Sequence, residues 1–341
     1  MAKMSLSVRY RPKTFEDMTE QTAIKDILEN QIKTKTFQHG YLFTGPSGTG
    51  KTTSARIFSN MINDGKGNPI EVDAASNSGV DNIRQIIEDA KRKPLDAEYK
   101  IFIVDECHSL SDSSWQALLK TLEEPPKFTI FIFCTTNPEK IPATILSRVQ
   151  RYNFQKISNE GIVKRLNDIL KCESEVSDAP ISCSTDAIEY IAKVSSGGMR
   201  DAITLLDKCL SLSHDVTLEN VLKTIGGEDY STFITFLSAL EKKEREVSIK
   251  VVEDVYNAGK DVKQFMKDFA KFILEVEKYT IYGNFDYVNL PNTLESNLEQ
   301  LNSVDLFNVM DFVVSLNNQI KWENDARTLI ELSILIYCGK E

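Results

Sequence analysis

One stretch of the sequence decides the fold: Tyr41-Leu42-Phe43-Thr44-Gly45-Pro46-Ser47-Gly48-Thr49-Gly50-Lys51-Thr52. Its second part fits the pattern G-x-x-x-x-G-K-[ST], in which glycines let backbone N–H groups close around phosphate oxygens. A short apolar run precedes the pattern and a helical pattern follows it, which is the context that this motif requires. The helix directs its positive N-terminal end at the phosphates. We therefore predict a phosphate-binding loop, with Lys51 on the β- and γ-phosphates and Thr52 on Mg²⁺.

Short apolar runs alternate with helical patterns through the first half of the chain. The apolar runs, each suited to a strand buried on both faces, are Tyr41–Thr44, Ile70–Asp73, Ile101–Val104 and Ile130–Cys134. The helical patterns are Thr52–Ile62, Val80–Lys93 and Ser113–Glu124, the last of which is stopped by two prolines. Strands that alternate with helices predict βαβ units and therefore an α/β fold with a parallel, doubly wound sheet.

The second half of the chain has a different pattern. From Asn159 onward apolar residues recur at every third or fourth position and no strand run is evident. The best linker candidate is residues 225–228, which contain two glycines. We predict an α/β domain over residues 1–158, a small helical domain over 159–226 and an all-helical domain over 227–341. At about 150 residues per domain, 341 residues suggest two or three domains.

The negative charge of the chain belongs to its second half. Residues 1–158 hold 21 Lys and Arg against 19 Asp and Glu, a net +2, and residues 159–341 hold 19 against 31, a net −12. The whole-chain value of −10 argues against a protein that coats nucleic acid non-specifically, because such binding depends on phosphate neutralisation. A near-neutral first half is still compatible with a local positive face.

Composition also bears on location. No stretch approaches the run of about 20 apolar residues that a membrane span needs, and the first ten residues contain no apolar signal core. Six scattered cysteines without a CxxC pair indicate reduced thiols rather than a disulfide or zinc framework. We expect a cytoplasmic protein.

Two acids follow the apolar run that ends at Val104. An acid at the end of a buried strand can hold the Mg²⁺ shell, which suits Asp105. Glu106 can orient and polarise an attacking water. The next two residues, Cys107 and His108, match no metal-ligand spacing, and we interpret them as structural.

Other polar positions are less specific when each is taken alone. Thr136 and Asn137 follow the last apolar run and would lie beside the γ-phosphate if that strand neighbours the one that ends at Asp105. Arg148 follows a short helical segment, where a surface charge is the common explanation. Arg200 begins a helix after two glycines, and it is either a phosphate contact or a surface charge at a helix start.

Taken in order, these motifs resemble a known family. They are Arg9-Tyr10-Arg11-Pro12, the phosphate-binding loop, Asp105-Glu106, Leu118–Pro126, Thr136-Asn137, Ser147-Arg148 and Gly198-Met199-Arg200-Asp201. This order resembles the AAA+ ATPase subunits of DNA sliding-clamp loaders, a P-loop NTPase fold followed by a helical lid and a collar domain. The runs Leu118–Pro126 and Asp73–Ser76 are more similar to the bacterial DNA polymerase III gamma/tau type than to the small subunits of replication factor C.

The resemblance implies a role for each matching position, with ATP and Mg²⁺ as ligands. The implied catalytic residues are Glu106, Lys51 and, acting in trans, Arg148. Thr136 would be the first sensor and Arg200 the second. The implied nucleotide-binding residues are Arg11, Pro12, Gly45, Pro46, Ser47, Gly48, Thr49, Gly50, Lys51, Thr52, Thr53, Thr136, Asn137 and Arg200. Thr52 and Asp105 would hold the Mg²⁺ of the ATP site.

The resemblance also implies partners. Arg148 matches a trans-acting arginine finger, which completes the ATP site of a neighbouring subunit and is worth about 10³–10⁵ in rate. In the family such subunits form a five-membered ring that opens a sliding clamp and places it on primer–template DNA. Arg84 and Lys120 match basic positions that face DNA, with a solvated helix face as the alternative.

Some positions depart from the bacterial pattern. Only residues 64–69 connect the first helix to the next strand, where relatives usually carry a cysteine zinc module, so no zinc is expected. Asn77 and Gly79 are uncharged where relatives tend to be basic, and Val149 stands where a cysteine is typical. The chain stops at Glu341 without a tau-type extension. We expect a compact, zinc-free clamp loader that is phage-encoded, and then located in the host cytoplasm, or from a reduced bacterial system.

Two other functions compete with the clamp-loader hypothesis. The first is another AAA+ DNA-remodelling motor, such as a branch-migration helicase. Such a motor would be expected to have a C-terminal winged-helix pattern, and the C-terminal part of this sequence has only helical patterns. A non-catalytic scaffold subunit of a clamp loader would have no need of an intact Gly50-Lys51-Thr52 or of Glu106.

Overall fold

The computed structural model describes residues 4–176, 180–225, 230–285, 287–291, 294–301 and 306–339. The chain forms two compact units, one of Met1–Ile181 with Ile191–Lys208 and the other of Ser182–Tyr190 with Cys209–Glu341. Three of the four residues of the predicted linker, 226–228, lie outside the described residues. The predicted domain boundaries after residues 158 and 226 remain predictions.

The first unit is built on a five-stranded parallel sheet with the strand order β2-β3-β4-β1-β5. The strands are β1 (Gly40–Thr44), β2 (Ile70–Asp73), β3 (Lys100–Asp105), β4 (Thr129–Thr135) and β5 (Gln150–Asn153). Register pairs Asp73 with Asp105 and Thr44 with Thr135, so the carboxyl ends of four strands lie along one edge. The parallel sheet predicted from the sequence is confirmed.

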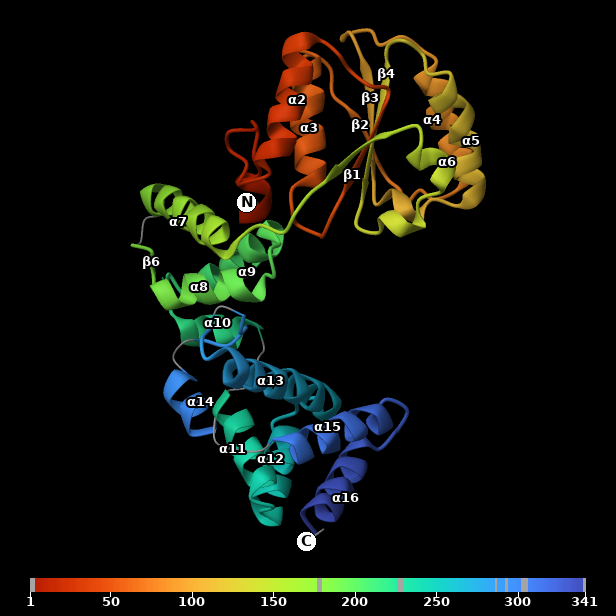
Figure 1. The fold of residues 1–341 in the computed structure, drawn as a ribbon. Coiled ribbons are helices and arrows are strands. Elements are labelled where there is room, and N and C mark those ends of the chain that lie inside the picture. The colour runs from red at the N-terminus through yellow and green to blue at the C-terminus, as the bar shows by residue number, and fades with distance from the viewer. Residues whose placement is uncertain are drawn as a thin grey trace. The chain divides into compact units, whose positions relative to one another are not determined.

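Both faces of this sheet are covered by helices, as Figure 1 shows. On one face lie α2 (Thr22–Thr34) and α3 (Lys51–Ile62), and on the other α4 (Val80–Ala90), α5 (Asp112–Glu123) and α6 (Ala143–Leu146). Alternate residues of β1 pack on opposite faces of the sheet. Tyr41 and Phe43 lie in the core beneath α2 and α3, and Leu42 lies in the core beneath α4, α5 and α6. The doubly wound arrangement is therefore confirmed, although α4 ends three residues before the predicted Lys93.

The two edge strands differ from the sequence prediction. In β2 Ile70 and Val72 are only half-buried and the acids between and after them are exposed, so this strand is not buried on both faces. It lies at the edge of the sheet, where one side has no neighbouring strand. The other edge strand, β5, was not predicted, because Tyr152 is its single buried residue and it has no apolar run.

Further short elements and helices complete the part of the chain before residue 226. They are α1 (Leu6–Arg9), η1 (Cys107–Ser109), η2 (Pro138–Lys140), α7 (Asn159–Val176), α8 (Thr185–Val194), α9 (Met199–Leu212) and α10 (Leu218–Ile225). The predicted apolar spacing after Asn159 is confirmed as a helix, with Ile162 and Leu166 fully buried. The expectation of no strands there was wrong, because β6 (Ser182–Cys183) pairs with β7 (Asp215–Val216). These strands are two residues long and leave no period to detect.

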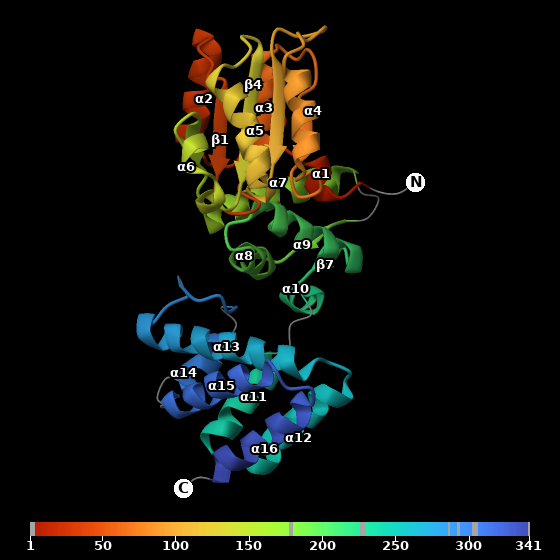
Figure 2. The ribbon, with the colours of Figure 1, turned by 90° about the vertical axis from the view of Figure 1, so that its right-hand side faces the viewer.

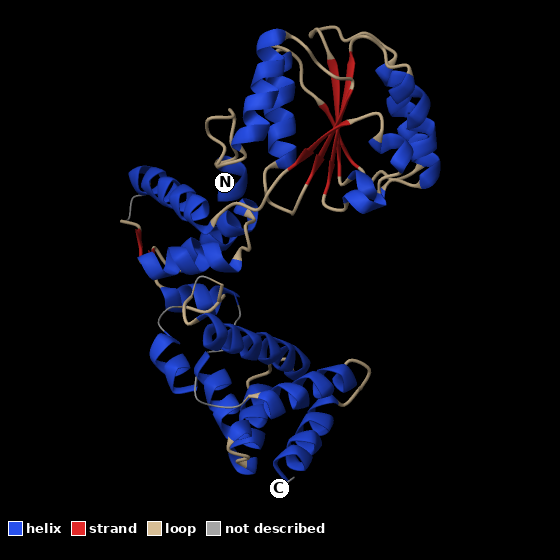
Figure 3. Cartoon of the chain, in the orientation of Figure 1, coloured by secondary structure: helices blue, strands red, loops and turns tan. Residues whose placement is uncertain are grey.

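The C-terminal part of the second unit is helical in all its described elements (Figures 2 and 3). The helices are α11 (Tyr230–Glu241), α12 (Arg245–Asn257), α13 (Val262–Tyr282), α14 (Glu295–Leu301), α15 (Phe307–Ile320) and α16 (Ala326–Gly339). They share one core in which rings of α11 and α13 interlock, and the centroids of Phe236 and Phe269 lie 4.7 Å apart. Among the described residues no helix has the length and apolarity of a membrane span.

Candidate nucleotide-binding site

The loop between β1 and α3 has the backbone that the glycine pattern predicts. Gly45, Gly48 and Gly50 have φ angles of +138°, +72° and +101°, a region that other residues rarely adopt. A Cβ atom on Gly45 would stand 2.3 Å from the carbonyl oxygen of Phe154, and one on Gly48 would stand 3.0 Å from the Cα of Gly198. The glycines are therefore needed both for the turn and for the close approach of neighbouring backbone.

Lys51 begins α3 and places its ammonium group inside this loop. Its Nζ donates to the carbonyl oxygens of Gly45 and Pro46, each at 2.8 Å. The residue is buried, and this desolvation lowers its pKa, while the nearby Glu106 and Asp105 act in the opposite direction. A cation held among backbone dipoles at the start of a helix suits the binding of a phosphate group.

Thr52 and Asp105 bring two oxygen ligands together at the edge of the sheet. The Thr52 hydroxyl, on the first turn of α3, donates to Oδ2 of Asp105 at 2.8 Å. Asp105 is the last residue of β3, so the parallel sheet itself directs it toward the loop. Hydroxyl and carboxylate oxygens are the ligands that Mg²⁺ prefers, and both belong to the wall of one pocket. The residues present therefore fit a magnesium ion.

Glu106 lies directly after β3 with a φ of +46°, in the left-handed region. Strained backbone of this kind gathers at functional sites. Its Oε2 accepts a hydrogen bond of 3.2 Å from the Thr136 hydroxyl, which follows β4. β4 pairs with β3, so the strand before Thr136 does neighbour the strand that ends at Asp105, as the sequence prediction for Thr136 required. Neither Thr136 nor Asn137 lies in the wall of the candidate nucleotide pocket, and the Asn137 backbone N–H donates to the Thr135 hydroxyl at 3.0 Å.

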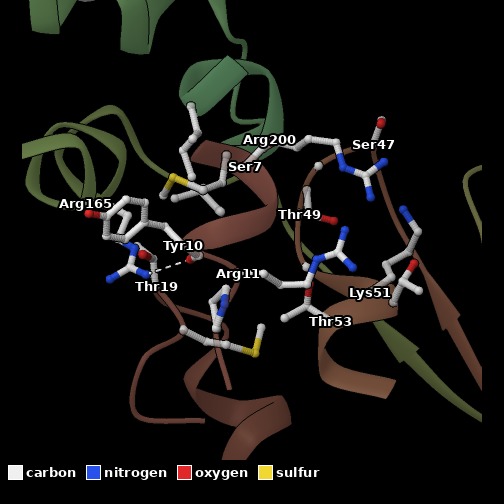
Figure 4. Close-up of a pocket in the computed structure, with 18 of the residues that line it drawn as sticks. Ser7, Tyr10, Arg11, Thr19, Ser47, Thr49, Lys51, Thr53, Arg165 and Arg200 are labelled. Carbon is white, nitrogen blue, oxygen red and sulfur yellow. Dashed lines mark hydrogen bonds between the residues drawn. The ribbon is translucent and has the colours of Figure 1, made fainter. Parts of the chain in front are cut away.

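Most of the predicted residues line one pocket, which Figure 4 draws in close-up. The predicted residues in its wall are Arg11, Pro12, Ser47, Gly48, Thr49, Gly50, Lys51, Thr52, Thr53, Asp105, Glu106 and Arg200. In Figure 4 the side chains of Arg11, Lys51 and Arg200 lie on the same side of the pocket as Thr49. Gly45 and Pro46 contribute their carbonyl oxygens to Lys51 instead.

The start of α9 touches the phosphate loop directly. The backbone N–H of Met199 donates to the carbonyl oxygen of Gly48 at 3.0 Å. Arg200, the next residue, lies in the wall of the pocket. The sequence left this arginine open between a surface charge and a phosphate contact, and its position in the wall favours the phosphate contact.

One part of the pocket was missed by the sequence analysis. Glu173, a buried acid of α7, accepts a 2.7 Å hydrogen bond from Arg9 Nη2 and a 2.5 Å hydrogen bond from the Tyr10 hydroxyl. Burial and this carboxylate raise the pKa of Tyr10 to about 12. Arg165 of the same helix donates to the Tyr10 carbonyl oxygen at 3.0 Å, the dashed line in Figure 4. The one sequence feature that could have indicated this contact is the acid Glu173 at a position of the α7 pattern where an apolar residue is expected.

Comparison with known proteins agrees with this geometry. A model of the family described as DNA polymerase III, delta subunit, matches residues 70–158. The chain is 34% identical to the DNA polymerase III subunit tau of Bacillus subtilis (strain 168), over 99% of the chain and 64% of that relative. It is 35% identical to the DNA polymerase III subunit gamma/tau of Mycoplasma genitalium, over 86% of the chain and 52% of the relative.

The chain is a homologue of the DNA polymerase III gamma/tau subunits. It spans about half to two thirds of the length of these relatives, 52% of one and 64% of the other. Among solved structures it is similar to the Thermotoga maritima RuvB Holliday junction branch migration motor, with a TM-score of 0.50 over 74% of this chain and 86% of that chain. The sequence identity is 20%, so this likeness shows the fold alone. The AAA+ fold predicted from the sequence is confirmed.

In this gamma/tau homologue Arg148 lies outside the pocket of its own chain. It follows α6, and its Nη2 lies 2.5 Å from Oε1 of Glu123, the last residue of α5. Its Nη1 donates to the Thr144 carbonyl oxygen at 2.6 Å. A third of the side chain is exposed. Arg148 is therefore not part of the wall of the pocket that contains Lys51.

The two predicted DNA-contacting residues of the homologue are exposed on neighbouring helices. Arg84 of α4 pairs with Asp81 at 3.1 Å, and both side chains are open to solvent. Lys120 lies in the last turn of α5 and is exposed. Exposure suits a solvated face as well as a DNA contact, so the DNA role of these residues remains a prediction.

Proposed function

We propose that this chain is an ATP-hydrolysing clamp-loader subunit, which opens a DNA polymerase sliding clamp within an oligomeric ring and places it on primer–template DNA. The observation that carries the proposal is the convergence of Lys51, the Thr52–Asp105 pair and Glu106 on one pocket at the carboxyl edge of the sheet. The homology to DNA polymerase III gamma/tau subunits supports the replication role.

In the proposed reaction the phosphates of ATP bind between the loop backbone and the start of α3. The N–H groups of the loop and the Lys51 ammonium donate to phosphate oxygens, exchanging the carbonyl partners that Lys51 has in this structure. Thr52 and Asp105 would hold a magnesium ion, which supplies charge neutralisation on the β- and γ-phosphates when bound. Arg11 and Pro12 contact the nucleotide from the N-terminal segment, and Arg200 reaches the phosphates from α9.

Glu106 is the proposed catalytic carboxylate. Its position beside Asp105 brings it to the metal end of the pocket, where it orients a water for attack in line with the leaving oxygen. Thr136, which donates to Glu106 in this structure, is proposed to turn its hydroxyl to the γ-phosphate as the first sensor. These roles account for a non-glycine residue in the left-handed region at position 106.

Arg148 is proposed to act on a neighbouring subunit. The guanidinium lies beside Glu123 and not in the wall of its own pocket, so a contact with ATP requires a second subunit. An arginine supplied in trans stabilises the charge that develops on the transferred phosphoryl group. This supports a ring, for which we propose five subunits, with Arg84 and Lys120 facing the DNA.

One assay tests the proposal as a whole. ATP turnover of the assembled protein should be low alone and should rise when the cognate clamp and a primed template are both present. Release of the clamp onto the template, followed with a labelled clamp, should require hydrolysable ATP. Turnover that responds to a four-way junction and not to the clamp would favour the branch-migration alternative, and no turnover under any condition would favour a scaffold subunit.

A further inference from the structure

His108 stands between the catalytic carboxylate and the end of β4. It lies in the 3-10 turn η1 directly after Glu106, and its side chain is 16% exposed. Its Nδ1 is 3.0 Å from the hydroxyl oxygen of Thr135 and 3.3 Å from Oε2 of Glu106. From the sequence we predicted a structural role for His108. Its spacing of two residues from Glu106 is compatible with the contact between the two side chains in the structure.

The contacts indicate which ring nitrogen carries the proton. If Nδ1 were unprotonated, its lone pair would face an ionised carboxylate oxygen at 3.3 Å, and the two would repel. With a hydrogen on Nδ1, the ring donates to the Thr135 hydroxyl, and the positive end of the same N–H lies close to the Glu106 carboxylate, whose Oε2 is 3.3 Å from Nδ1. The Thr135 hydroxyl has room for this second bond, because it already accepts from the Asn137 N–H and an oxygen has two lone pairs.

Two side chains contact the same Glu106 oxygen, and they differ in what else they are needed for. Thr136 donates its hydroxyl hydrogen to Oε2 at 3.2 Å. A hydroxyl has only one hydrogen to donate, so Thr136 cannot serve Glu106 and a γ-phosphate oxygen with it at the same time. His108 has no such second duty, because Thr135, the other partner of its Nδ1, is fully buried at the end of β4.

We propose that His108 is a positioning residue that holds the Glu106 carboxylate at the end of β4 while the Thr136 hydroxyl turns to the γ-phosphate. The ring fixes Oε2 and leaves Oε1 to bind the attacking water. This inference rests on the proposed catalytic role of Glu106. It assigns His108 no contact with the nucleotide, so its loss should lower turnover and leave ATP affinity unchanged.

Variants of the full chain, assembled with its partners, test this assignment. His108→Ala should lower kcat for ATP about tenfold, the scale of one polar contact with a charged group. The dissociation constant for a non-hydrolysable ATP analogue should stay within about twofold of the parent value, because Lys51 and the loop are unchanged. His108→Asn, which places an amide N–H near the position of Nδ1, should restore most of kcat.

Two further variants separate packing and the proposed function from this inference. His108→Phe fills the space of the ring without a donor, so it should behave like His108→Ala; recovery of kcat by Phe would show that only packing matters and would overturn the proposal. Glu106→Gln should abolish turnover. If it does, but His108→Ala retains the parent kcat, the His108 inference alone fails. If Glu106→Gln retains turnover, the proposed catalytic role fails and the inference fails with it.

Discussion

At the scale of single residues the pocket depends on a few buried polar contacts. Lys51 is 6% exposed and has two carbonyl partners, while Thr52 and Asp105 share a hydrogen bond. Each of these groups exchanges a protein partner for a ligand when nucleotide binds, so the cost of desolvating them is already met in this structure. Such a site is ordered before its ligand arrives.

Lys51→Ala should remove most of the affinity for ATP. A charge-assisted hydrogen bond is worth about 1.5–3 kcal/mol, so the loss of the ammonium group should raise the dissociation constant for ATP by about tenfold to a hundredfold. Binding of a fluorescent ATP analogue measures it, with Lys66→Ala, an exposed lysine of the loop before β2, as the control. An unchanged dissociation constant in Lys51→Ala would contradict the phosphate-loop assignment.

At the same scale Gly45 and Gly79 offer a matched pair of glycine substitutions. Gly45→Ala puts a Cβ 2.3 Å from a backbone oxygen at a φ of +138°, and backbone strain alone costs about 1–3 kcal/mol. Gly79, which precedes α4, has a φ of −70°, and a Cβ atom added to it would meet no other atom within 4 Å. Thermal unfolding should therefore show a clear loss of stability in Gly45→Ala and almost none in Gly79→Ala. Equal effects would mean that the loop backbone can relax.

At the scale of elements the N-terminal segment is joined to α7 through Glu173. The carboxylate bonds both Arg9 and Tyr10, which directly precede the pocket residues Arg11 and Pro12. The contact therefore links the position of that segment to α7, and it holds part of the nucleotide pocket in place. Sequence position alone gives no hint that residues 9 and 173 meet.

Glu173→Ala should weaken ATP binding without touching the nucleotide. The substitution leaves the partly buried Tyr10 hydroxyl and one face of Arg9 without their acceptor, at a cost of about 1–3 kcal/mol to folding. Urea unfolding and ATP titration should both shift, whereas Glu175→Ala, an exposed acid of the same helix, should shift neither. A loss of stability with unchanged ATP affinity would show that α7 does not position Arg11 and Pro12.

The central strands and the phosphate loop could be predicted because their signals are local. β1, β3 and β4 are apolar runs, and the glycines of the loop have φ angles that demand glycine. The edge strand β5 and the pair β6–β7 were not predictable, since they are polar or only two residues long. The contacts of Glu106 with Thr136 and of His108 with Thr135 depend on strand order, which no local pattern encodes.

At the scale of the whole molecule the proposed DNA-facing charge and the proposed arginine finger both require partners. The ATPase half carries a net +2 and the remainder −12, so the DNA-facing charge proposed for Arg84 and Lys120 is a local feature. Arg148 adds a stronger requirement, because its guanidinium is held by Glu123 outside its own pocket. A single chain therefore contains a pocket and a proposed finger that do not meet.

Arg148→Ala should leave ATP binding intact and lower DNA-stimulated turnover of the assembled ring by up to about 10³-fold or more, since an in-trans arginine acts on the transition state. Arg151→Ala, an exposed arginine three residues later, is the control and should be silent. Mixing decides the geometry. A Lys51→Ala subunit keeps its finger and an Arg148→Ala subunit keeps its site, so two inactive preparations should recover turnover when assembled together. No recovery in rings shown to contain both variants would mean that Arg148 does not act on a neighbour, because a Lys51→Ala subunit, whose own site is impaired, can restore turnover only by supplying its arginine to another subunit.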